Sequence, residues 1–130
     1  MARRRQLAVG AALVVLGVDL VQLALTPTDF HHARSAPWLA LTGALVVAIL
    51  VVGPRAPSRA LALAGGVAAG GALGNLAAAL IWSAGVPDPL VLGAYAFNLA
   101  DVAVVVGVCA MVTAALATIW TNRGRLREPV

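Results

Sequence analysis

Four long apolar stretches, separated by short polar segments that contain proline, account for most of the chain. Each approaches the roughly 20 residues that a helix needs to cross the hydrocarbon core of a bilayer. The pattern predicts an all-α integral membrane protein with four transmembrane helices and short loops, in a single membrane domain over residues 1–130. The predicted spans are Leu7 to Leu25, Trp38 to Gly53, Ala60 to Trp82 and Ala96 to Trp120.

The composition supports this prediction. Hydrophobic residues make up 62% of the 130 residues and charged residues 11%, which is far more apolar than the composition of soluble domains. The first span could also be the apolar core of a signal peptide. It is too long for that, and no small-residue cleavage site follows it, so we expect it to remain as an uncleaved helix.

The arginines are distributed unevenly over the ends of the predicted spans. Only Arg34 falls on the side of the first and third loops. The other eight fall on the opposite side: Arg3, Arg4, Arg5, Arg55, Arg59, Arg123, Arg125 and Arg127. Because basic residues stay inside, both termini are predicted to be cytoplasmic. The net charge of +4 is therefore interpreted as a topology signal, and no nucleic-acid partner is expected.

Five polar side chains within the spans are expensive to place in lipid, so they carry the functional information. They are Asp19, Gln22, Asn75, Asn98 and Asp101. At about 1.5 Å per residue, Asp19, Asn75 and Asp101 share one depth in the outer half of the bilayer. We predict that these three and Asn98 line one cavity open to the outer surface. For Asp19, a purely structural bond between helices is an equally good interpretation. Asn98, three residues before Asp101 on the same predicted helical face, can orient that acid.

Asp88 lies in a Pro-Asp-Pro loop on the same outer side. An acid in such a rigid turn is usually just solvated. Asp101 follows it by only thirteen residues, however, and a short loop cannot carry the two acids far apart. Two neighbouring carboxylates in a low-dielectric place cannot both ionise cheaply, so one tends to keep a proton. Such a pair can activate water and protonate a carbonyl oxygen, as aspartyl proteolysis requires.

Other conspicuous residues favour structural interpretations. Glycine recurs every fourth residue from Gly66 to Gly74, a pattern typical of close helix packing. The adjacent His31 and His32 have no third ligand nearby, so a metal site is not expected. Arg34 could pair with a lipid phosphate or serve as an ordinary interfacial anchor.

Three blocks in the second half of the chain resemble the signature blocks of bacterial lipoprotein signal peptidase, signal peptidase II. They run from Gly70 to Leu76 (GGALGNL), from Gly85 to Asp88 (GVPD) and from Phe97 to Asp101 (FNLAD). The order of the blocks and the four-span topology are similar to that family. The resemblance implies that Asp88 and Asp101 are the catalytic aspartates and that Asn75 and Asn98 hold substrate and order the site. It also implies cleavage just before a diacylglyceryl-cysteine, without metal or cofactor.

The chain departs from the family pattern at several positions. The family usually continues Gly-Asn-x-x-Asp-Arg, whereas Ala78 and Ala79 stand here. Its first-helix acid is usually followed four residues later by Lys, whereas Leu23 follows Asp19. The Asn-Gly-x-Ala-Phe block is missing, and Pro89 stands where an aromatic is usual. The resemblance is therefore to a divergent, actinobacterial-like member.

We expect a divergent lipoprotein signal peptidase, an intramembrane-type aspartic endopeptidase of a bacterial plasma membrane. Its expected catalytic residues are Asp88 and Asp101, and its expected substrate-binding residues are Asn75, Asn98, Asp19 and Arg34. Its expected partners are a lipid-modified prolipoprotein and membrane lipids, and we expect a monomer. The alternative is a non-catalytic relative that binds lipid or a membrane partner in the same cavity. A small proton-coupled transporter is disfavoured by the charge bias and by the nearly apolar inner halves of the helices.

Overall fold

The computed structural model describes residues 1–55 and 58–123 of the chain. Its long helices are α1 (Ala2–Leu25), α2 (Ala36–Val52), α3 (Arg59–Ile81) and α4 (Leu99–Asn122). The short 3-10 helix η1 (Gly53–Arg55) extends α2. All four spans are long and apolar enough to cross a membrane, as expected of a multi-pass membrane protein. Arg125 and Arg127, which entered the charge count above, lie outside the described residues.

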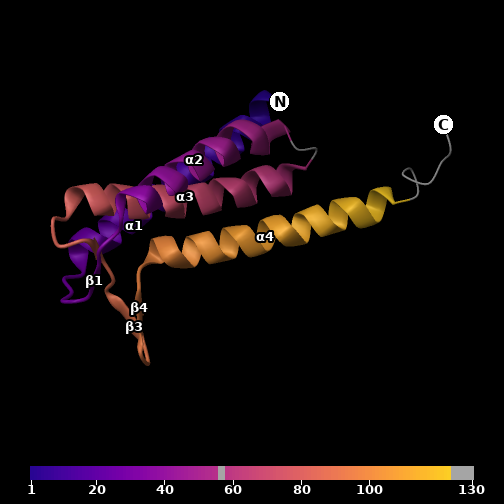
Figure 1. Cartoon of the computed structure of the whole chain (residues 1–130). Coiled ribbons are helices and arrows are strands. Elements are labelled where there is room, and N and C mark those ends of the chain that lie inside the picture. Colours follow the sequence, from indigo (N-terminus) through magenta and orange to yellow (C-terminus); the bar gives the residue numbers. More distant parts are fainter. Residues whose placement is uncertain (56–57, 124–130) are drawn as a thin grey trace.

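Helix α3 is the centre of the bundle, and α1, α2 and α4 all pack against it (Figure 1). Its glycines allow this close approach. A Cβ atom added at Gly66 would lie 2.3 Å from the carbonyl oxygen of Ala8 in α1. A Cβ atom at Gly71 would lie 2.4 Å from the carbonyl oxygen of Ala100 in α4. The packing role predicted for the repeat from Gly66 to Gly74 is confirmed, because helix backbones touch where the side chain is missing, and Gly71, outside that repeat, does the same towards α4.

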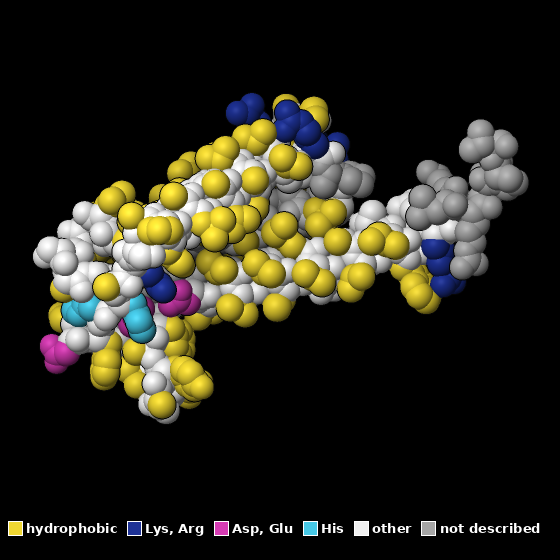
Figure 2. Space-filling view, in the orientation of Figure 1, with side chains coloured by type: hydrophobic (Ala, Val, Ile, Leu, Met, Phe, Trp, Pro, Cys, Tyr) yellow, Lys and Arg dark blue, Asp and Glu magenta, His cyan; other side chains and the backbone are white. Residues whose placement is uncertain are grey.

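The outer faces of the helices are apolar, whereas charged side chains gather at the two ends of the bundle (Figure 2). Only 6% of the hydrophobic window of α2 and of α4 is buried inside the protein. In water such exposed apolar surfaces would cause aggregation, whereas lipid tails are equally apolar and solvate them without a free-energy penalty. We call the end where α1 and α3 finish and α4 begins the site end. The opposite end, where α1 begins, is the arginine end.

The loops at the site end contain four short strands that the sequence did not predict. Strand β1 (His31–His32) pairs antiparallel with β2 (Val86–Pro87), and β3 (Leu90–Leu92) pairs with β4 (Tyr95–Phe97). The β3–β4 hairpin projects from the bundle in Figure 1. Because residues 95–97 are extended in this hairpin, the fourth helix begins at Leu99 rather than at Ala96.

Candidate active site

Asn98 and Asp101 form a capping box at the start of α4. The backbone N–H of Asp101 donates to Asn98 Oδ1 at 2.9 Å, and the backbone N–H of Asn98 donates to Asp101 Oδ2 at 3.3 Å. The prediction that both residues share a helical face is wrong, because Asn98 is extended and stands just outside the helix. It nevertheless orients Asp101, since the reciprocal cap fixes both the backbone and the carboxylate.

The side-chain amide of Asn98 reaches the second acid. Its Nδ2 lies 2.9 Å from Asn75 Oδ1, 3.2 Å from the Pro87 carbonyl oxygen and 3.4 Å from Asp88 Oδ1. Asn75 Nδ2 in turn donates to Asp101 Oδ1 at 2.8 Å. An amide has only two N–H donors for these three acceptors, so the longest contact is the weakest. Asn98 therefore contacts both carboxyl groups, one through its backbone and one through its side chain.

Asp88 is completely buried, with 0% of its surface exposed, so the interpretation of a solvated loop acid is wrong. The β1–β2 pairing explains the burial. It carries the 28–32 segment across the loop, where the Asp88 N–H donates to the Phe30 carbonyl oxygen at 2.9 Å. Burial raises the pKa of Asp88, and the nearby Asp101 raises it further, whereas His32 and Arg34 act to lower it. Desolvation is the strongest of these effects, so the pKa of Asp88 lies above the ordinary value for an aspartate.

His32 is the residue at this site that the sequence did not predict. Its Nδ1 contacts Asp88 Oδ2, although 56 residues separate the two in the chain. Its imidazole is 55% exposed on the far side, so it links the buried acid to solvent. The nearest signal in the sequence is the unusual His31-His32 pair, but only the side-chain contact in the structure shows that His32 is the one that faces Asp88.

Asp19 joins the first and last helices. Its side chain is 0% exposed, and Oδ1 accepts the backbone N–H of Ala100 at 2.8 Å. The Oδ2 atom is buried and has no hydrogen-bond partner among the described residues. Gly74 leaves room for it, since a Cβ there would stand 2.6 Å from Oδ2. The depth argument thus placed Asp19, Asn75 and Asp101 at one level. The Asp19 Oδ2 atom remains available to contact a ligand.

Arg34 lies at the edge of the same group. Its guanidinium carbon is 4.6 Å from the centroid of the Trp38 ring, a cation–π arrangement that holds it over α2. Its Nε atom is buried without a hydrogen-bond partner among the described residues. The side chain is close enough to lower the pKa of Asp88, so it contributes positive charge to the site.

A protein-family model for signal peptidase (SPase) II matches residues 10–117, which include every site residue described above. The chain belongs to this family. The signal peptidase II family consists of aspartic peptidases that process lipoproteins in membranes, so the family assignment made from the sequence blocks is confirmed. Comparisons with curated proteins and with solved structures gave no significant match.

Three of the positions where this signal peptidase II chain departs from its family lie together in the fold. Leu23 and Ala78, at the expected Lys and Asp positions, form a buried apolar cluster with Val86, and Ala79 packs against it. Apolar packing residues therefore stand at all three of these positions. A lone buried charge would be costly, whereas a matched apolar replacement is often neutral or stabilising. Val86 is two residues from Asp88, so the cluster supports the loop that carries this acid.

Proposed function

We propose that this chain is an active signal peptidase II whose catalytic dyad is Asp88 and Asp101. The observation that carries the proposal is Asn98, which contacts one carboxyl group through its side chain and the other through its backbone. This arrangement ties the two acids to one residue of a capping box. A dyad needs such rigid support because small displacements of reacting groups are costly.

The two acids have different surroundings, which suggests different roles. Asp88 is the proposed acid, because burial raises its pKa, and it donates a proton to the carbonyl oxygen of the scissile peptide. Asp101 receives two N–H donors, from Asn75 and from Asn98, contacts that suit an ionised carboxylate. Asp101 takes a proton from water as the water oxygen attacks the carbonyl carbon. It then gives this proton to the leaving amine when the carbon–nitrogen bond breaks, and a hydroxyl proton of the intermediate returns to Asp88.

The substrate proposed is a prolipoprotein carrying a diacylglyceryl-cysteine, taken up from the outer half of the bacterial plasma membrane. The orientation follows from the arginine bias, with both termini cytoplasmic and the site end outside. Asn75, Asn98, Asp19 and Arg34 are the proposed substrate-binding residues. Asp19 Oδ2 and Arg34 Nε support this, since both are buried polar atoms that lack a partner among the described residues. The whole chain acts as one membrane domain and a monomer, without metal or cofactor.

The test is complementation of a bacterial strain that lacks its own signal peptidase II, with the uncleaved precursor followed on gels. The wild-type chain should clear the precursor, whereas Asp88→Asn and Asp101→Asn should each lose on the order of 100-fold to 10,000-fold in rate. Asp29→Asn is the matched control, because Asp29 is an exposed acid at the same end of the bundle. Failure of the wild-type chain on several substrates, with protein present in the membrane, would favour the alternative of a non-catalytic relative. The replacements at Leu23, Ala78 and Ala79 are the observation that keeps this alternative open.

A further inference from the structure

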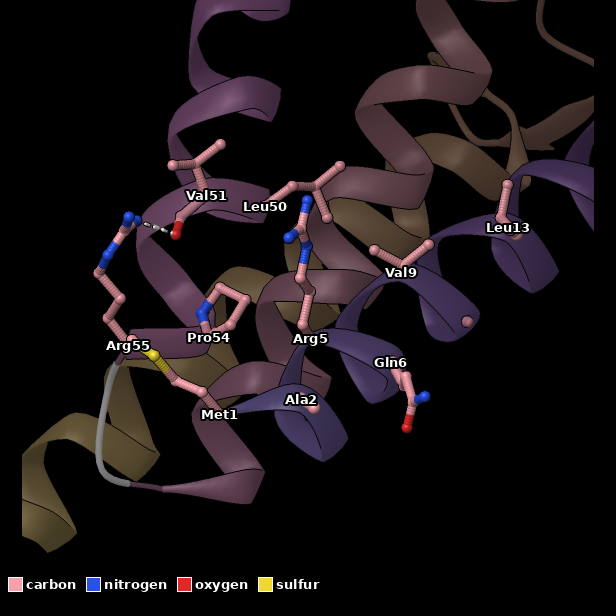
Figure 3. Close-up of a pocket in the computed structure, with 11 residues that line it drawn as sticks. Met1, Ala2, Arg5, Gln6, Val9, Leu13, Leu50, Val51, Pro54 and Arg55 are labelled. Atoms are coloured by element: carbon pink, nitrogen blue, oxygen red, sulfur yellow. Dashed lines mark hydrogen bonds between the residues drawn. The ribbon is translucent and has the colours of Figure 1, made fainter.

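A cavity lies far from the acids, at the arginine end. It is a cavity of about 890 Å³ between the start of α1 and the end of α2. Most of its lining residues are apolar, among them Val9, Leu13 and Leu50, and its polar lining residues are Arg5, Gln6 and Arg55. Figure 3 shows Arg5 pointing from α1 into the space between the two helices, towards Leu50. Arg55 belongs to the lining at the end of α2; in Figure 3 its guanidinium lies across α2 from that of Arg5 and donates to the carbonyl oxygen of Val51.

This cavity belongs to the surface that lipid covers, because several of its wall residues are strongly exposed. Leu13 is 59% exposed and Val51 is 51% exposed. Apolar walls alone select nothing in a bilayer, since lipid tails are as apolar as leucine. The two arginines are the discriminating element, because guanidinium groups bind phosphate oxygens through paired N–H donors. They stand at the helix ends, where headgroups lie, while the apolar walls continue along α1 to Leu13.

We propose that this cavity binds one anionic phospholipid. Arg5 and Arg55 hold its phosphate, and an acyl chain lies along Val9, Leu13 and Leu50. The occupant is a membrane lipid and not the prolipoprotein substrate, whose scissile peptide has to reach the acids at the opposite end. This lipid site does not depend on the proposed catalysis, so the two proposals can be tested separately.

The first test uses charge. The full chain, purified in detergent, is mixed with phosphatidylglycerol or with phosphatidylcholine of the same acyl chains, and bound lipid is counted by native mass spectrometry. The wild-type chain should prefer phosphatidylglycerol. Arg5→Gln with Arg55→Gln should weaken that binding by about fivefold for each arginine removed. The double variant Arg3→Gln with Arg59→Gln is the matched control, because it removes the same charge from the same end outside the cavity lining.

The second test fills the cavity. A Cβ atom at Gly10 meets nothing within 4 Å, so Gly10→Leu can enter the space without displacing a helix. It should reduce phosphatidylglycerol binding, whereas Gly17→Leu should not, because Gly17 has the same open surroundings two turns further along α1 and does not line the cavity. Three results would each overturn the proposal. They are equal binding of both lipids, an equal loss of phosphatidylglycerol binding in the Arg3 and Arg59 control, and full competition by inorganic phosphate.

Discussion

Replacing Gly71 by alanine tests whether the spacing of α3 and α4 sets the geometry of the proposed dyad. The new Cβ atom would lie 2.4 Å from the Ala100 carbonyl oxygen and 2.9 Å from the Val104 nitrogen. Ordinary van der Waals contact begins near 3.4 Å, and both neighbours are backbone atoms that cannot rotate aside. Helix α4 must therefore move by about 1 Å, and it carries Asp101 with it. A displacement of that size can cost on the order of 100-fold in rate.

The expected result is a fall in kcat of roughly that size in the precursor-cleavage assay with purified enzyme. The overpacking should also cost about 1 to 3 kcal/mol in stability, visible as a lower melting temperature. Gly17→Ala is the control, since a Cβ at Gly17 meets nothing within 4 Å and only helix propensity changes. If Gly71→Ala folds and cleaves within threefold of the wild-type rate, then the close contact of α3 with α4 does not set the position of Asp101.

Four further predictions address other parts of the structure. His32→Ala removes a group that lowers the pKa of Asp88, so the pH at which activity is lost as Asp88 ionises should move upward in the rate profile; an unchanged or lower limb would contradict this role. Asn98→Ala should lower the melting temperature through the lost cap, worth about 1 kcal/mol in the free energy of unfolding. It should lower the cleavage rate by far more than this loss of stability explains. Asp19→Asn should be mild, within about tenfold in rate, because Asn Oδ1 can still accept the Ala100 N–H. Outside the cell, a thiol reagent should label a cysteine at Ser83 and spare one at Ser58, and the reverse pattern would overturn the proposed topology.

Local physics was enough to predict the helices and most of the site. Long apolar runs bounded by proline gave all four helices, although the first begins five residues before its predicted start. The fixed rise of a helix then converted sequence positions into depths. That conversion brought Asp19, Asn75 and Asp101 to one level, where the structure joins them through Asn75 Nδ2 and the Ala100 N–H.

The surroundings of Asp88 could not be derived in this way. Whether a loop acid is solvated or buried depends on what another loop places over it. Here the covering segment lies more than fifty residues earlier, and its pairing rests on a two-residue strand too short to leave a pattern. The β3–β4 hairpin did leave a signal, since Leu90–Leu92 and Tyr95–Phe97 flank the two-residue connection Gly93-Ala94, with Gly93 at φ 61°. The apolar Ala96 and Phe97 concealed part of it, because the predicted fourth helix began at Ala96.

The hydrogen bond that the Ala100 N–H donates to Asp19 can form only after α4 has been synthesised and inserted. Helix α1 is synthesised and inserted first, when residue 100 does not yet exist. Its carboxyl group must therefore enter the bilayer without its partner, a burden of up to about 3 kcal/mol on insertion scales. The apolar residues of α1 offset this cost of insertion until α4 is inserted and supplies both the Ala100 N–H group and Asp101. A chain truncated before α4 lacks half of the proposed dyad and leaves Asp19 without the Ala100 N–H. Under the proposed function, cleavage of precursors therefore begins only after α4 has been inserted.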